Sequence, residues 1–270
     1  MAKQDAVILG AGAAGLAAAK ALGRLGAKVL LVEKEALGGD CIAWGCVPSK
    51  AYLHVARTLN EARTSSRYGV DTGAVSFDFA KARQYVSQVQ KTLTLQDTKE
   101  SLRGQGVNIA FGSARLLAPD RIDLNGEIVE TRHVILATGA HAVAPPIEGL
   151  AETGFLDSRT ALQIERLPAS MIILGGGPIG TEFAQMYQRM GVAVTVVESN
   201  PRLLPREEPE AGDYLLRLLE AEGARFVSER RAVKALKTSG GKALVLRRKD
   251  GAEETVEAQE ILVATGRAPN

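Results

Sequence analysis

Short apolar runs alternate with longer amphipathic stretches along much of this chain. The first run covers residues 5–9, and a second, at residues 28–32, follows an alanine-rich stretch that ends near Leu25. Continuous apolar runs of this length are typical of strands that are buried on both faces of a parallel sheet. The pattern therefore predicts a strand, a helix and a second strand parallel to the first.

Glycines mark the turn between this first strand and its helix, at Gly10, Gly12 and Gly15. They let the backbone approach a pyrophosphate, and the helix N-terminus supplies unpaired amides and the positive end of its dipole. Glu33, at the end of the second strand, can bind a pair of ribose hydroxyls. This arrangement predicts a dinucleotide-binding unit.

The same order recurs in the second half of the chain. A strand at residues 171–174 leads into a turn with Gly175, Gly177 and Gly180, then a helix and a strand that ends at Glu198. The first glycine and the acid are 23 residues apart in both copies, from 10 to 33 and from 175 to 198. One glycine pattern alone is a weak signal, because many turns that enter helices contain glycines. Two copies with the same spacing indicate an internal repeat.

Each copy also ends in a similar phrase, an apolar strand followed by Ala-Thr-Gly, at residues 133–139 and 260–266. The backbone at the end of such a strand can lie against a cofactor. Thr138, Gly139 and Gly266 are therefore further candidate cofactor-binding residues.

The stretches around these copies predict the remaining organisation. A proline-containing segment at residues 144–150 is the expected domain boundary. Periodic apolar positions predict one long helix over residues 79–103, and turn residues break residues 107–129 into short strands. A helix over residues 210–222 and short strands as far as Val256 complete the second half.

The overall composition argues against several classes of protein. Hydrophobic residues make up 46% of the chain and charged residues 24%, as in a globular protein with an ample core. The net charge of +2 is too small to indicate nucleic-acid binding, and we interpret Arg230 and Arg231 as part of a solvated strand face. No apolar stretch reaches the ~18 residues of a membrane span, and the N-terminus does not resemble a signal peptide. We expect a cytoplasmic protein.

The chain has only two cysteines, Cys41 and Cys46, and glycines lie close to both of them. In a regular helix, residues five apart are separated by about 8 Å, beyond the ~7 Å that a disulfide spans. Gly38, Gly39 and Gly45 can supply the distortion that brings the sulfurs together.

These thiols have more than one interpretation on sequence alone. Lys50, four residues after Cys46, can favour a thiolate there. The pair could instead be half of a zinc site, with His54, His133 or His141 as the remaining candidates, or two inert buried thiols. We favour no metal site, because four ligands are needed and no second cysteine pair exists.

Gly-Cys-Val-Pro-Ser-Lys at residues 45–50, between two nucleotide-binding units, resembles the class I FAD-dependent pyridine nucleotide–disulfide oxidoreductases. That family includes dihydrolipoamide dehydrogenase, glutathione reductase and mercuric reductase. The resemblance implies an α/β fold with two Rossmann-like domains of the three-layer ββα type. It implies an FAD domain at residues 1–145, an NAD(P) domain at 146–266, and a return to the FAD domain at 267–270.

The resemblance also implies roles for individual residues. Cys46 would be the sulfur that faces the flavin, and Cys41 the sulfur that meets the substrate. Lys50 would lie near the flavin and pair with Glu182. FAD and then NADH or NADPH would be bound by two sets of residues. The FAD set is Gly10, Gly12, Gly15, Glu33, Gly39, Lys50, Thr138 and Gly139, and the nicotinamide set is Gly175, Gly177, Gly180, Glu198 and Gly266.

Finer features bear on the substrate and the coenzyme. Residues 201–209 look most like the mercuric-reductase-like branch, which we favour over dihydrolipoamide dehydrogenases, so the expected substrate is a small-molecule disulfide or Hg(II). Asp40 replaces the threonine usual in the family and would oppose a thiolate at Cys41. Glu198 favours NADH, because a carboxylate repels a 2′-phosphate, whereas Arg202 and Arg206 leave NADPH open.

The family resemblance implies further segments beyond residue 270. A glycine-aspartate segment and a dimerisation domain with a His-Glu acid/base pair would follow, so we expect a C-terminally truncated chain whose complete enzyme is a homodimer. Two alternatives stay open. The chain could be a nucleotide-binding module without turnover, or a flavin NADH dehydrogenase or oxidase in which the thiols are incidental.

Overall fold

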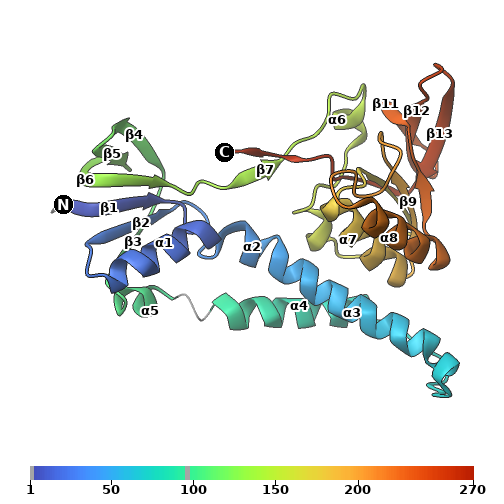
Figure 1. Ribbon diagram of the computed structural model, residues 1–270, viewed down its shortest axis with the longest axis horizontal. Coiled ribbons are helices and arrows are strands. Elements are labelled where there is room, and N and C mark those ends of the chain that lie inside the picture. Colours follow the sequence, from blue (N-terminus) through green and yellow to red (C-terminus); the bar gives the residue numbers. More distant parts are fainter. Residues whose placement is uncertain (1–2, 95–97) are drawn as a thin grey trace. The chain divides into compact units, whose positions relative to one another are not determined.

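The computed structural model of the chain describes residues 3–94 and 98–270 (Figure 1). It consists of two compact units, each assembled from separate stretches of chain. The first unit contains Met1–Pro48, Val86–His141 and Pro269–Asn270, and the second contains Ser49–Tyr85 and Ala142–Ala268. The expected FAD and NAD(P) domains stay a prediction, because compactness alone assigns no cofactor to either unit.

A six-stranded sheet organises the first unit, in the order β3-β2-β1-β6-β5-β4. Strands β1, β2 and β3 and the second part of β6 run parallel, whereas β4, β5 and the first part of β6 form an antiparallel meander. The strands are β1 (Gln4–Leu9), β2 (Val29–Glu33), β3 (Val107–Phe111), β4 (Ala114–Ala118), β5 (Arg121–Leu124) and β6 (Glu127–Leu136).

The central strands of this sheet bury both of their faces. Ile8 and Leu31 pack in a cluster with Leu16 of helix α1 (Ala13–Arg24). The alternate residues Val7 and Leu30 pack in a second cluster on the other face, with apolar side chains of the meander. Because the side chains of a strand alternate between its faces, a strand must be apolar at consecutive positions to supply side chains to both clusters.

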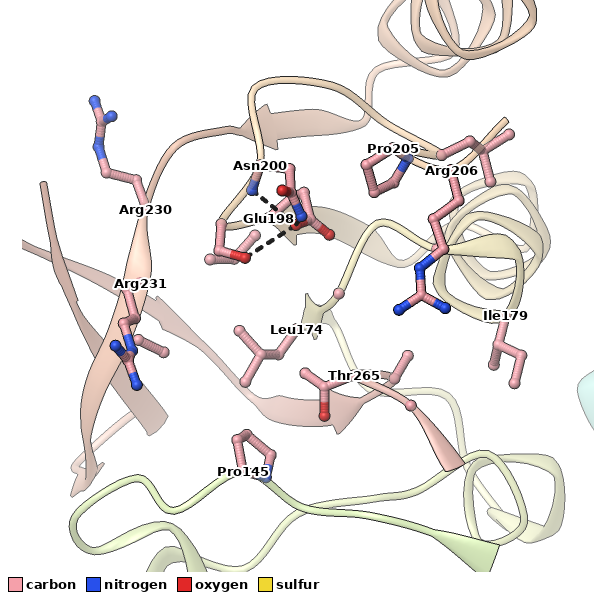
Figure 2. Close-up of a pocket in the computed structure, with 18 of the residues that line it drawn as sticks. Pro145, Leu174, Ile179, Glu198, Asn200, Pro205, Arg206, Arg230, Arg231 and Thr265 are labelled. Atoms are coloured by element: carbon pink, nitrogen blue, oxygen red, sulfur yellow. Dashed lines mark hydrogen bonds between the residues drawn. The ribbon is translucent and has the colours of Figure 1, made fainter. Parts of the chain in front are cut away.

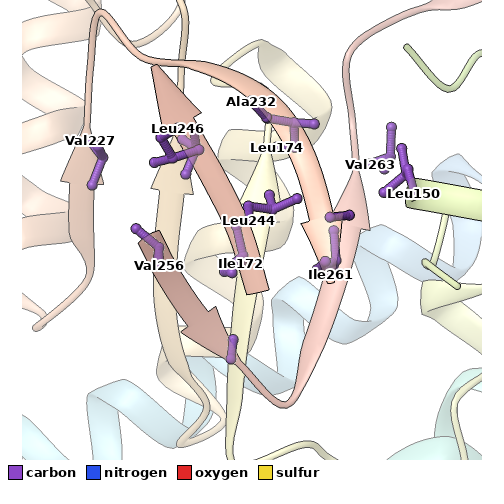
Figure 3. Close-up of a cluster of buried hydrophobic side chains, with 13 residues drawn as sticks. Leu150, Ile172, Leu174, Val227, Ala232, Leu244, Leu246, Val256, Ile261 and Val263 are labelled. Carbon is purple, nitrogen blue, oxygen red and sulfur yellow. The ribbon is translucent and has the colours of Figure 1, made fainter. Parts of the chain in front are cut away.

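The second unit contains a parallel sheet in the order β10-β9-β8-β14 and an antiparallel meander in the order β11-β12-β13. Figure 3 shows the apolar cluster between them, in which Ile172 and Ile261 of the parallel sheet meet Leu244 and Leu246 of the meander. The strands are β8 (Ser170–Leu174), β9 (Ala193–Val197), β10 (Arg225–Val227), β11 (Arg231–Thr238), β12 (Gly241–Arg247), β13 (Glu253–Ala258) and β14 (Glu260–Val263).

Helices α7 (Pro178–Arg189) and α8 (Pro209–Ala221) contact the parallel sheet of this unit. Helix, parallel sheet and meander form successive layers, so the predicted α/β class with ββα layers is confirmed. The shorter elements of the chain are α2 (Gly39–Ala43), η1 (Ser65–Tyr68), β7 (Ala140–Ala142), α6 (Leu150–Thr153), η3 (Ala161–Gln163) and β15 (Arg267–Pro269).

The prediction of one helix over residues 79–103 was wrong, because two helices are present. Helix α4 covers Phe79–Thr94 and helix α5 covers Lys99–Arg103, and residues 95–97 lie outside the described residues. The hydroxyl of Thr98 accepts the backbone N–H of Ser101 at 3.2 Å. This contact caps a new helix, a start signal that the apolar periodicity did not reveal.

Helix α3 (Cys46–Thr64) is the longest helix among the described residues. None of the helices in the described ranges combines the length and the apolar character that crossing a membrane requires.

Candidate nucleotide-binding sites and cysteine pair

The first glycine turn is built by close backbone contacts. Gly10 has a φ of +105°, and a Cβ there would lie 2.3 Å from the carbonyl oxygen of Ala137. A Cβ at Gly15 would lie 1.8 Å from the carbonyl oxygen of Gly10. Both distances exclude a side chain, so these glycines allow strand β1, the end of β6 and helix α1 to approach one another.

The second turn repeats this geometry. Gly175 has a φ of +112°, and its Cβ would lie 2.6 Å from the carbonyl oxygen of Ala264. A Cβ at Gly180 would lie 1.9 Å from the carbonyl oxygen of Gly175. The first glycine of each turn therefore contacts the alanine of its own Ala-Thr-Gly phrase, which explains why the phrase accompanies both turns.

The middle glycines face open space instead. A Cβ at Gly12 would have only the Cα of Gly39 near it, at 4.0 Å, and one at Gly177 would meet no atom within 4 Å. These positions lie at the N-caps of helices α1 and α7. Each turn thus leaves an uncovered helix N-terminus, where a phosphate can accept backbone N–H groups.

The two acids bind the backbone of their own turns. Glu33 is 7% exposed, and its Oε2 accepts the N–H of Ala11 at 2.7 Å. Its Oε1 accepts the N–H groups of Lys34 and Glu35, at 2.8 and 2.7 Å. These three bonds hold the carboxylate against the glycine turn. Of its roughly four acceptor positions, about one stays free for a ligand.

Glu198 has a fuller set of donors. It is 6% exposed, and its Oε2 accepts the N–H of Gly176 at 2.7 Å. Its Oε1 accepts the N–H of Asn200 at 2.8 Å, the Asn200 side-chain amide at 2.7 Å and the Ser199 hydroxyl at 3.1 Å. Four donors use the acceptor capacity of a carboxylate, so a ribose hydroxyl would have to displace one of them. The sequence spacing located this acid but did not reveal its hydrogen bonds.

A pocket with a volume of about 710 Å³ opens beside the second turn (Figure 2). Gly175, Gly177, Glu198 and Gly266 are among its lining residues, together with Arg206, whose side chain points into it in Figure 2. Four residues of the predicted nicotinamide set and Arg206 therefore meet at one cavity.

Two other arginines of this pocket were not expected from the sequence, which suggested a solvated strand face. Arg230 and Arg231 both line it, and Arg230 is bound to Glu254 at 2.5 Å. Arg206 and Arg231 form no ion pair or side-chain hydrogen bond with any residue in the described ranges. Two unpaired guanidinium groups are thus available to an anionic ligand.

The cysteines lie on two successive helices rather than on one. Cys41 belongs to α2 and Cys46 begins α3, and only Trp44 and Gly45 separate the two helices. A Cβ at Gly45 would lie 2.9 Å from the carbonyl oxygen of Asp40, so a glycine is required at this bend. The predicted distortion between the cysteines is therefore present.

The two thiols interact with each other. Burial raises the pKa of Cys41 to about 11. A side-chain hydrogen bond with Cys46 and electrostatic repulsion between the two sulfurs add to the effect, whereas a hydrogen bond with the backbone of Cys46 opposes it. The negative charge of Asp40 raises the pKa of Cys41 further, which agrees with the prediction that Asp40 would disfavour a thiolate there. Cys41 is consequently protonated at neutral pH.

Helix α2 begins directly at the first glycine turn. The N–H of Gly38 donates to the carbonyl oxygen of Ala11 at 2.9 Å, and a Cβ at Gly39 would lie 2.7 Å from the Cα of Gly12. The cysteine pair and the first glycine turn are therefore parts of one continuous structure within the first unit.

Comparison with known proteins places this arrangement in a family. A family model described as pyridine nucleotide-disulphide oxidoreductase matches residues 4–270. The chain belongs to this family.

Individual relatives agree with that assignment. Dihydrolipoyl dehydrogenase of Acholeplasma laidlawii is 34% identical over 98% of the chain and 79% of the relative, and that of Bacillus subtilis is 35% identical over 98% and 59%. A solved Cu(II) complex of the HOCl-induced flavoprotein disulfide reductase RclA from Escherichia coli has a TM-score of 0.81 at 28% identity, covering 98% of the chain and 56% of that structure. The chain thus spans less than two thirds of the last two proteins.

Pyridine nucleotide-disulphide oxidoreductases use FAD and NAD(P)H, and the glycine turns of this chain fit such cofactors. The fit rests on the open positions at Gly12 and Gly177 and on the backbone contacts that exclude side chains at Gly10 and Gly175. None of the relatives named above is a mercuric reductase, so the favoured Hg(II) branch stays a prediction.

The ends of the Ala-Thr-Gly phrases are held by backbone contacts. The Thr138 hydroxyl donates to the carbonyl oxygen of Asn270 at 3.1 Å, and the N–H of Asn270 donates to the carbonyl of Gly139 at 3.0 Å. In the second unit, the Thr265 hydroxyl donates to the carbonyl of Val143 at 3.1 Å. These bonds fix the strand ends against which a cofactor would lie.

Lys50 and Glu182 form the expected ion pair within the second unit. Lys50 Nζ lies 2.7 Å from both carboxylate oxygens, with the two side chains 58% and 39% exposed. An ion pair this exposed adds little to stability, about 0–1 kcal/mol. Within the described residues, no group of three or more His, Cys, Asp or Glu side chains is arranged to hold a metal ion.

Proposed function

We propose that this chain is the cofactor-binding and thiol-bearing part of an FAD-dependent NAD(P)H:disulfide oxidoreductase. The observation that carries the proposal is the start of helix α2 at Gly38 and Gly39, directly against Ala11 and Gly12 of the first glycine turn. A dithiol that is continuous with a nucleotide-binding turn can exchange electrons with the cofactor held there. An isolated pair of structural thiols has no need of that connection.

When bound, FAD would accept two electrons as a hydride from the nicotinamide and pass them to a disulfide. In the chain itself, two electrons and two protons break the Cys41–Cys46 bond and leave two thiols. Cys41 then attacks a substrate disulfide as a thiolate, which forms a mixed disulfide and releases the first substrate thiol. Cys46 attacks the sulfur of Cys41 in that mixed disulfide, so the Cys41–Cys46 bond forms again and the second substrate thiol leaves. The net reaction consumes one NAD(P)H, one proton and one substrate disulfide, and yields NAD(P)⁺ and two substrate thiols.

The raised pKa of Cys41 adds a requirement to this scheme. Burial and the contact with Cys46 keep its thiol protonated at neutral pH, so a base must accept the proton before Cys41 can attack. We propose that the complete enzyme supplies this base from its dimer partner, and that it works in the cytoplasm as a homodimer. Lys50, paired with Glu182, is proposed to lie near the flavin.

For the substrate, we propose a small-molecule disulfide. Relatives named dihydrolipoyl dehydrogenase and disulfide reductase support this class. Hg(II) is a second candidate on the likeness of residues 201–209 to mercuric reductases. Cu(II) is worth testing beside it, because the RclA structure is a Cu(II) complex and thiolates are good ligands for soft metal ions.

The proposal is tested on the purified chain after its cysteines have been oxidised. Added FAD should bind, and NADH or NADPH should then bleach its visible absorbance and raise the number of free thiols by two. Cys46→Ser and Cys41→Ser should keep FAD binding and show no gain of two thiols. Lipoamide, glutathione disulfide, Hg(II) and Cu(II) are then compared as electron acceptors.

The two alternatives give different results in this experiment. A nucleotide-binding module without turnover would bind a dinucleotide but show no bleaching and no new thiols. A flavin NADH dehydrogenase with incidental thiols would show bleaching with unchanged thiols, and the serine variants would react like the wild type.

A further inference from the structure

Gln90 of helix α4 contacts the bend between the two cysteines. Its side-chain Nε2 donates to the carbonyl oxygen of Ile42 at 3.1 Å and to that of Ala43 at 2.8 Å. Both acceptors are backbone carbonyls, so only the NH₂ end of the amide can face them. One side chain distant in sequence thus binds the last two residues of the helix that carries Cys41.

These two carbonyls belong to the last two residues of the short helix that carries Cys41. Helix α2 has five residues, and it is followed by only Trp44 and Gly45 before Cys46. The last carbonyls of a helix have no partner within the helix and need one outside it. At this bend, the Gln90 amide supplies that partner for Ile42 and Ala43.

The position of this bend sets the distance between the two sulfurs. Cys41 lies before it and Cys46 after it, and the thiols are in hydrogen-bond contact with the bend in place. An intramolecular disulfide forms more readily when its two sulfurs are already held close, because less chain entropy is lost on closure. A side chain that anchors the bend therefore favours the disulfide over two separate thiols.

We propose that Gln90 is a positioning residue that raises the equilibrium constant for forming the Cys41–Cys46 disulfide. The inference rests on the proposed function in that the pair is taken to be a working redox couple. Gln90 contacts neither sulfur in this role, and it acts only through the carbonyls of Ile42 and Ala43.

Glutathione redox buffers test this proposal without FAD or a nicotinamide cofactor. In the exchange, the new bond joins Cys41 Sγ to Cys46 Sγ, the bond of glutathione disulfide breaks, and both protons end on two glutathione thiols. The protein is equilibrated over a range of buffer ratios, quenched with acid and alkylated, and the disulfide fraction is measured by mass spectrometry.

Gln90→Met keeps the length of the side chain and removes both donors. We expect its equilibrium constant for disulfide formation to be about fivefold lower than that of the wild type, from the partial loss of two hydrogen bonds. Gln88→Met, on the exposed side of the same helix, is the matched control and should equal the wild type. Gln90→Glu, ionised at neutral pH and without donors, should also lower the constant.

The stability of each redox form separates positioning from general support of the fold. If Gln90→Met lowers the melting temperatures of the oxidised and reduced forms equally and leaves the equilibrium constant unchanged, the proposal is overturned. If Gln90→Met does not fold, the melting temperatures and the equilibrium constant for disulfide formation are compared for Gln90→Glu instead, with the same criterion. A wild-type pair that stays reduced at every buffer ratio would overturn both this proposal and the proposed function, whereas a normal wild type with unchanged variants would overturn this proposal alone.

Discussion

At the scale of single residues, the environment of Cys41 has the most direct chemical consequence. Burial is the largest cause of its raised pKa, followed by the contact with Cys46. A thiol reacts as its thiolate. With a pKa of about 11, only a very small fraction of Cys41 is a thiolate at neutral pH, so Cys41 is a poor nucleophile there.

Alkylation of Cys41 in the reduced chain should therefore depend steeply on pH. Because the thiolate fraction grows tenfold with each pH unit below the pKa, its initial rate with iodoacetamide should rise about tenfold per unit between pH 7 and pH 10. Tandem mass spectrometry assigns the label to Cys41. In Cys46→Ala, the hydrogen bond and charge that raise the pKa are gone, so the steep rise should end at a lower pH. A rate that is already flat at pH 8 in the wild type would contradict the assignment.

Glu198 illustrates how a residue can be found correctly and understood incompletely. Its position after the second strand is predicted by the spacing, and that position suggested a ribose ligand. Spacing along a chain contains no information on which N–H groups will surround a carboxylate. The structure shows four donors on it, which makes its first role the support of the turn.

We expect Glu198→Gln to destabilise the second unit. Its amide presents an NH₂ group to at least one donor that the carboxylate accepted, and a buried unsatisfied donor costs about 1–3 kcal/mol. The measurement is the free energy of unfolding in denaturant. Glu207→Gln, at an exposed acid that lines the same pocket, is the control and should unfold like the wild type. Unchanged stability of Glu198→Gln with weakened NADH binding would mean that the carboxylate is mainly a ligand group.

At the scale of the structural elements, the repeated glycine turn is the best-predicted part of the molecule. The spacing placed Gly10 and Gly175 correctly, because backbone contact at the end of a parallel strand leaves room for no other residue. Helix boundaries were harder to predict. Apolar periodicity continues across residues 79–103, but the cap at Thr98 depends on one hydroxyl that no periodicity reflects. Gln90 escaped prediction for the same reason, because its partners lie 47 and 48 residues away.

Two glycines of the second turn should respond differently to alanine. Gly180→Ala places a methyl group 1.9 Å from the carbonyl oxygen of Gly175, so the backbone must move at a cost of about 1–3 kcal/mol or more. Gly177→Ala places the methyl group in open space and should leave stability within about 0.5 kcal/mol. Thermal unfolding measures the first effect. Titration with NADH and NADPH should show weakened binding for Gly177→Ala, and normal binding would contradict the proposed phosphate position there.

At the scale of the whole molecule, the path of the chain matters more than any single contact. The second unit takes residues 49–85 from the first half of the sequence. Contacts that tie this segment to helix α7 include Lys50 with Glu182 and the Arg63 guanidinium, which donates to the carbonyl oxygen of Arg189 at 2.7 Å. Such an arrangement could not be predicted from the internal repeat, because the repeat suggests two consecutive domains.

A fragment of residues 142–268 should therefore be less stable than the same residues in the full chain. Without residues 49–85, it lacks the partners of Glu182 and of the Arg189 carbonyl. Differential scanning calorimetry should give a lower melting temperature for the fragment. Adding residues 49–85 as a separate peptide should raise the melting temperature again. A fragment that melts like the second unit in the full chain would contradict this expectation.

The chain passes between the two units at residues 48–49, 85–86, 141–142 and 268–269, and this has a consequence for protein engineering. A coenzyme-binding module that ends where its sequence motif ends can be exchanged between homologues as one cassette. Here, a graft of residues 142–268 alone would combine the pocket of one homologue with residues 49–85 of another, although both stretches belong to the same compact unit. On the proposed coenzyme role of this pocket, chimeras intended to change coenzyme preference would have to transplant residues 49–85 together with the pocket, as two insertions rather than one.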